Sequence, residues 1–140
     1  MPSDAPDLHR AAATGNVAWM KELIEEGVDL NSHDIIMQTP LHYAARYKKT
    51  ATAELLIQSG ASVDSEDYCE RTPLMISCEV GKADITELLL KGGAEANRED
   101  NFGNTPLHYA VCFAGDEDQR RMQRRIVEML IERNAEVNAV

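Results

Sequence analysis

The sequence of 140 residues has few aromatic side chains, few cysteines and no long apolar run. Aromatic residues make up 5% of the chain and hydrophobic residues 44%, so the core is expected to be aliphatic. Cys69, Cys78 and Cys112 lack the close spacing of a zinc or redox site, which indicates a reducing compartment. No segment reaches the ~20 apolar residues of a membrane helix, and residues 1–10 lack a signal-peptide layout. These absences predict a cytoplasmic or nuclear protein.

Basic residues are also scarce relative to acidic ones. Fourteen Lys and Arg stand against 24 Asp and Glu, which gives a formal net charge of -10. Such a chain repels a phosphate backbone and attracts positive charge. We therefore expect no nucleic-acid partner and favour a basic protein partner.

One short motif occurs three times in the sequence. Thr-Pro-Leu begins at residues 39, 72 and 105, so each copy follows the previous one by 33 residues, and Leu8 continues the series backwards. A second recurring segment, which reads LIEEGVDLN, LIQSGASVD, LLKGGAEAN and LIERNAEVN, ends at Asn31, Asp64, Asn97 and Asn138. The last of these intervals is 41 residues, so the fourth unit carries eight extra residues, in or near the segment FAGDEDQRRMQRR.

Each unit reads as two helices joined by a tight turn. Thr before Pro suits a helix start, because the hydroxyl caps free amides and Pro loses no hydrogen bond in the first turn. Ile85, Leu88 and Leu89 recur at helical spacing, and Gly92-Gly93 then closes that helix. Since one such unit cannot bury its own apolar face, the sequence predicts an all-α repeat solenoid in which neighbours cover each other.

The segments TPLHYAA at 39–45, TPLMISC at 72–78 and TPLHYAV at 105–111 resemble ankyrin repeats. The resemblance covers essentially the whole chain and implies a single domain, 1–140, with units at about 6–38, 39–71, 72–104 and 105–140. It implies stacked antiparallel helix pairs with projecting β-hairpin-like loops, or fingers. It also implies a non-catalytic scaffold for protein–protein interaction.

The sequence departs from the family pattern in the fingers and at one histidine. The finger pattern D-x-x-G-x-T is intact only at 100–105, because Met37 and Glu70 replace the glycine. A positive φ there would strain them by about 1 kcal/mol, so we expect these two fingers to be shaped differently. The resemblance implies that His42 and His108 bond the preceding Thr hydroxyl and nearby backbone, whereas Met75 occupies that slot in unit three.

No residue pattern indicates chemistry. His33 has no second metal ligand at a usable spacing, and no Ser or Cys lies in a nucleophile motif. Gly92-Gly93 ends a helix instead of cradling a phosphate. The chain is therefore predicted to have no catalytic residue, no metal site and no cofactor.

The resemblance implies that a partner binds at variable slots: the two residues after the finger Asp, the one before Thr, and the end of the first helix of each unit. Four of the seven aromatic residues fall in these slots, which core packing does not require. We expect Tyr47→Ala, Phe102→Ala and Phe113→Ala to leave stability nearly unchanged. The candidate partner-binding residues are Ile35, Ile36, Gln38, Arg46, Tyr47, Tyr68, Arg71, Glu79, Asn101, Phe102, Asn104, Cys112 and Phe113.

A second candidate patch consists of Arg120, Arg121 and Arg124, and two interpretations of it are open. In one, the arginines lie on a solvated helix face and pair as Glu117–Arg121 and Arg124–Glu128. In the other, the eight extra residues lengthen this helix or its approach loop and present guanidinium groups to an acidic partner or a phosphate.

Two other functions remain open beside the interaction module. The chain could be the regulatory or targeting domain of a larger enzyme or channel, and the Arg120–Arg125 cluster could bind a phosphorylated or nucleotide ligand. Val127, Met129 and Ile131 continue the apolar pattern of the last unit. Further repeats or a second chain are therefore expected on the C-terminal face.

Overall fold

The computed structural model describes residues 7–112 and 115–138, and side chains up to residue 134. Within them the chain forms helices and no strand. The helices follow one another in four pairs: α1 (Asp7–Thr14) and α2 (Val17–Glu25), α3 (Pro40–Arg46) and α4 (Thr50–Gln58), α5 (Pro73–Val80) and α6 (Ala83–Lys91), α7 (Pro106–Val111) and α8 (Glu117–Asn138). The predicted all-α repeat architecture is confirmed.

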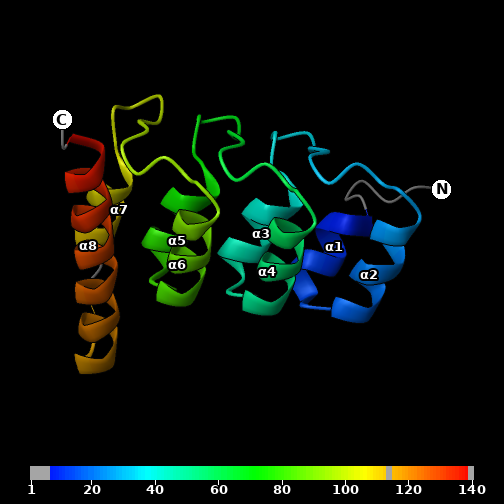
Figure 1. Cartoon of the computed structure of the whole chain (residues 1–140), viewed down its shortest axis with the longest axis horizontal. Coiled ribbons are helices and arrows are strands. Elements are labelled where there is room, and N and C mark those ends of the chain that lie inside the picture. The colour runs from blue at the N-terminus through cyan, green and yellow to red at the C-terminus, as the bar shows by residue number, and fades with distance from the viewer. Residues whose placement is uncertain (1–6, 113–114, 139–140) are drawn as a thin grey trace.

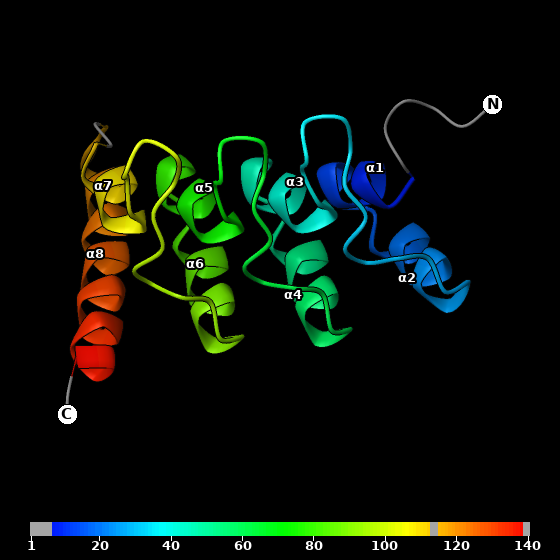
Figure 2. The same cartoon turned by 90° about the horizontal axis from the view of Figure 1, so that it is seen from above.

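The pairs stand side by side in one row from the N-terminal to the C-terminal end (Figure 1). Seen from above, the inner helices α1, α3, α5 and α7 form one layer and the outer helices α2, α4, α6 and α8 form another (Figure 2). The three loops that join one pair to the next all project on the same side of the row, at the top in Figure 1. We call these loops the fingers: residues 26–39, 59–72 and 92–105.

Each inner helix after the first begins at the predicted Thr-Pro. Thr39, Thr72 and Thr105 have extended backbone, and each hydroxyl accepts a hydrogen bond from the amide three residues later. At Thr39 and Thr105 the histidine side chain completes the capping box by accepting from the cap amide.

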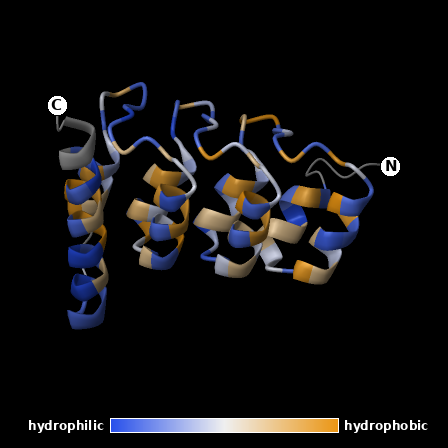
Figure 3. Cartoon of the chain, viewed as in Figure 1, coloured by the Kyte–Doolittle hydropathy of each residue, from blue (hydrophilic) through white to orange (hydrophobic). Residues whose placement is uncertain are grey.

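Equivalent leucines form the core, as the repeat predicts. Leu8, Leu41 and Leu74 are buried in the inner layer, and Leu23, Leu56, Leu89 and Leu130 are buried in the outer layer. Leu107 is only partly buried because no further helix pair of the described chain covers α7. Apolar residues therefore gather between neighbouring helix pairs, while α8 is largely polar (Figure 3).

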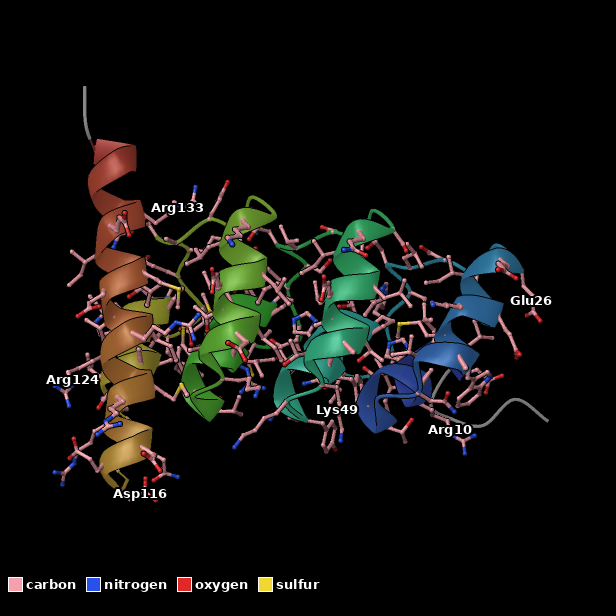
Figure 4. All side chains as sticks on the ribbon, turned by 60° about the horizontal axis from the view of Figure 1, so that its bottom comes forward. Arg10, Glu26, Lys49, Asp116, Arg124 and Arg133 are labelled. Carbon is pink, nitrogen blue, oxygen red and sulfur yellow. The ribbon has the colours of Figure 1, made fainter. Side chains whose placement is uncertain are left out.

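The insertion lengthens α8. This helix has 22 residues, against nine in each of the other outer helices. Its first turns extend beyond the end of α6, where Asp116 lies, and Arg133 lies toward the opposite end (Figures 1 and 4). Two residues after the other outer helices end stand Gly27, Gly60 and Gly93, which all have positive φ, whereas Asn134 occupies this slot in α8. Without the glycine the helix runs on to Asn138.

The expectation that two fingers differ in shape is wrong. Met37 and Glu70 have φ of 65° and 62°, in the same left-handed region as Gly103 at 80°. Lys48 likewise takes φ of 59° in the turn where Gly15 and Gly81 stand in other units. The hydrogen bonds around the finger aspartates hold this backbone conformation in spite of the larger side chains.

No helix of the described residues is long and apolar enough to cross a membrane.

Candidate functional site

Each finger is built around its aspartate. The Asp34 Oδ1 accepts the amides of Ile36 and Gln38 at 3.1 and 2.9 Å. Asp67 and Asp100 repeat this arrangement with the amides two and four residues later, at 2.8–2.9 Å. Because three separate loops satisfy their backbone in the same way, the side chains beyond each aspartate point from equivalent positions.

The second oxygen of each aspartate binds a side chain that the sequence did not single out. Tyr43 donates its hydroxyl proton to Asp34, and Tyr109 donates to Asp100 at 2.5 Å. Unit three has no tyrosine at this slot, and there the Arg71 Nε contacts Asp67 at 3.1 Å. The signal was a spacing of nine residues from aspartate to tyrosine, which recurs in units two and four.

These contacts shift the pKa values of both partners. Burial by itself would raise the pKa of Asp34, but the hydrogen bonds from Tyr43, Gln38 and Ile36 outweigh it and the pKa is lowered. Burial and the bond to Asp34 raise the pKa of Tyr43 to about 12. The carboxylate therefore stays ionised and the phenol stays protonated at neutral pH.

Histidines tie the first two fingers to the preceding inner helix. Nδ1 of His42 accepts the Thr39 amide at 3.1 Å, as the resemblance implied, while Nε2 lies 2.8 Å from the carbonyl oxygen of Arg71 in the next finger. His9 Nε2 binds the Gln38 carbonyl oxygen in the same way at 2.7 Å. Burial is the main cause that lowers the pKa of His42, which keeps its ring neutral.

Neighbouring fingers are also joined through their backbones. The amide of Tyr68 donates to the carbonyl of Ile36 at 3.0 Å, and the amide of Asn101 donates to that of Cys69 at 3.1 Å. The fingertips are thus held at fixed positions relative to one another.

The most exposed large apolar side chains of the described residues stand on these fingertips. Ile35 is 93% exposed, Tyr68 76% and Phe102 77%. Ile36 and Met37 are exposed beside them, and Met37 was not among the residues selected from the sequence. Ile35 and Tyr68 occupy equivalent slots, as do Ile36 and Phe102.

Gln38 requires a correction. The residue is only 4% exposed, so a partner cannot reach its side chain in this conformation. Its backbone carbonyl oxygen is hydrogen-bonded to His9. Tyr47 is exposed but also stacks on Tyr43, with ring centroids 6.3 Å apart and planes 20° apart. This ring therefore has a structural contact that its slot did not predict.

The other selected residues have different surroundings. Arg46, Arg71 and Asn104 are half-buried, and Arg71 is bound to Asp67. Glu79, Asn101 and Cys112 are exposed, and Phe113 lies outside the described residues.

The arginine patch lies on the lengthened part of α8. Arg120, Arg121 and Arg124 are exposed, but Arg121 and Arg124 both approach Glu117, at 4.0 and 3.4 Å. Instead of the expected Arg124–Glu128 pair, Arg124 contacts Glu117, two turns earlier in the helix. Glu117 pairs with two of the three arginines, which favours the solvated-face interpretation.

Arg125 is a structural residue that sequence reasoning did not distinguish from its neighbours. Its guanidinium reaches across to α6, where it contacts Asp84 at 3.2 Å and Glu87 at 2.5 Å. It joins α8 to the preceding pair, although its side chain remains 43% exposed.

No group of His, Cys, Asp and Glu within the described part of the chain is placed to hold a metal ion. Cys78 is buried, and burial raises the pKa of its thiol to about 12, so it is not a nucleophile.

The family model for ankyrin repeats, which spans three copies, matches residues 7–67 and 64–140. The chain belongs to the ankyrin-repeat family. No curated protein matches it. Ankyrin repeats are generally protein–protein interaction modules and are typically non-catalytic, as the sequence predicted. The matched ranges together cover all four helix pairs of this ankyrin array.

Proposed function

We propose that this ankyrin array binds another protein or peptide, without catalysis, through its fingertips and the adjoining face of the inner helices. The observation that carries the proposal is the row of apolar side chains on successive fingers, Ile35 at 93%, Tyr68 at 76% and Phe102 at 77% exposed. Clustered exposed aromatic and aliphatic side chains are typical of binding surfaces.

The rigidity of the fingers supports the same proposal. In each fingertip two backbone amides donate hydrogen bonds to an aspartate carboxylate, and neighbouring fingers share a backbone hydrogen bond. Side chains on a fixed frame lose little conformational freedom on binding, so more of the contact energy appears as affinity. A regulatory or targeting role within a larger protein would use this same surface.

The proposal does not extend to a phosphorylated or nucleotide ligand. Two of the three exposed arginines share Glu117, and Arg125 is bound to Asp84 and Glu87. These carboxylates compete with any anion for the same guanidinium groups.

The experiment compares proteins captured from cell extract by three forms of the chain. The finger variant is Ile35→Ser/Tyr68→Ser/Phe102→Ser, and the control, Met122→Ser, removes an exposed apolar side chain of α8. Circular dichroism first confirms that all three forms are folded. We expect proteins that wild type and control retain but the finger variant loses; identical retention by all three would refute the proposal.

A further inference from the structure

The fingers hold most of the net negative charge of the molecule. They contain ten of the 24 acidic residues but only two of the 14 basic ones, which gives a charge of -8 out of the total of -10. The negative potential of the protein is therefore concentrated at the end that also carries the exposed apolar row.

Both basic residues of the fingers are already paired within the array. Arg71 contacts Asp67 at 3.1 Å, and Arg98 contacts Glu66 at 2.7 Å and Glu95 at 3.0 Å. Neither is free to receive an acidic partner.

Two acidic side chains beside the apolar row have no such neutralising contact. Glu70 follows Tyr68 by two residues and Glu99 precedes Phe102 by three, and both are exposed. Neither forms an ion pair within residues 7–112 and 115–134. A molecule seated on the aromatic rings would lie close to these carboxylates.

We propose that the partner of the fingertips is a basic, extended protein segment that carries large apolar side chains. This inference rests on the binding face proposed above and adds the chemistry of its occupant. Apolar side chains of the segment cover Ile35, Tyr68 and Phe102, and its Lys or Arg side chains face Glu70 and Glu99. Opposite charge steers such a segment to the fingers, whereas an acidic segment or a nucleic acid is repelled.

The repeat also sets the spacing within the segment. Packed helices lie about 8–10 Å apart, so successive fingers follow at about that interval. An extended segment in the polyproline II conformation has three residues per turn and advances about 3.1 Å per residue, so apolar side chains three residues apart lie on one side of it and match successive fingers. The expected pattern is apolar residues at i and i+3 with Lys or Arg between them.

A library of short random peptides tests this chemistry directly. Peptides are selected on the wild-type chain and depleted on the Ile35→Ser/Tyr68→Ser/Phe102→Ser variant. We expect the enriched sequences to carry net positive charge and apolar residues at i and i+3. Enrichment of neutral or acidic apolar peptides would overturn the inferred chemistry and leave the binding face intact. Absence of any enrichment over the finger variant would overturn the binding face itself.

Charge reversal then separates local from overall electrostatics. The Glu70→Lys/Glu99→Lys variant and a control, Glu22→Lys/Glu54→Lys on the exposed surface of α2 and α4, change the net charge equally. With a selected peptide we expect about tenfold weaker binding for the finger variant and little change for the control. Wild-type binding should also weaken as salt is raised. Equal losses in both variants, or none in either, would overturn the assignment of these carboxylates.

Discussion

The left-handed residue of the second finger offers the sharpest test of how this array is held together. Glu70 has φ of 62°, a conformation that costs a side-chain-bearing residue about 1–2 kcal/mol but costs glycine nothing sterically. Glycine in turn loses about 0.5–1 kcal/mol more conformational entropy on folding. The difference predicts that Glu70→Gly stabilises the protein by about 0.5–1 kcal/mol, which for a domain of this size raises Tm by about 2–4 °C.

Two companion variants isolate the backbone effect. Glu70→Ala removes the same exposed carboxylate but keeps a Cβ, so we expect no gain in stability. Gly103→Ala places a Cβ at φ of 80°, where no neighbouring atom lies within 4 Å. The expected loss of stability of about 1 kcal/mol therefore comes from the backbone conformation and not from a clash with other residues. The two fingers should therefore respond in opposite directions to opposite substitutions.

The assay is urea unfolding followed by circular dichroism, with the fluorescence of Trp19 as a second probe. Trp19 is the single tryptophan and lies in α2, so it reports on the N-terminal pair while circular dichroism reports on all helices. Equal stabilities for Glu70→Gly and Glu70→Ala would refute the reasoning, as would an unaffected Gly103→Ala.

Three further predictions follow from other contacts. Burial lowers the pKa of His42, so its contribution to stability is present above the unfolded pKa of about 6.5 and is lost as pH falls below it. The urea midpoint of the wild type should therefore fall between pH 7 and pH 5. It should fall less in His42→Met, which places at this slot the residue that unit three has there. An equal fall in both proteins would contradict this. Arg125→Ala should reduce stability by about 0.5–1 kcal/mol and speed amide exchange in α8, whereas Arg121→Ala, whose side chain is 71% exposed, should do neither. Phe102→Ala should change the free energy of unfolding by less than about 0.5 kcal/mol while Leu74→Ala, at a fully buried position, lowers it by about 3 kcal/mol; a loss above about 2 kcal/mol for Phe102→Ala would show that its ring belongs to the core.

The exposed apolar row was partly predictable from sequence. Tyr68 and Phe102 stood out because the repeat assigns them to slots outside the core. The position of each residue within the repeat is enough to predict that its ring is exposed. Met37 was missed because it was considered only as a replacement for glycine, not for where its side chain lies. Gln38 is buried, which its slot did not reveal, because its burial depends on how the finger packs against α1.

The sequence by itself determined the repeat interval and the helix pairs. These features come from local chemistry, Thr-Pro caps, terminal glycines and leucines at helical spacing, and each acts within a few residues of itself. The tertiary structure decided which oxygen of each aspartate meets a tyrosine or an arginine, and that His42 reaches a carbonyl 29 residues away. It also decided that Arg125 reaches Asp84, 41 residues earlier. The His42 and Arg125 contacts join residues far apart in the sequence, so they exist only when stacking has brought neighbouring helix pairs together.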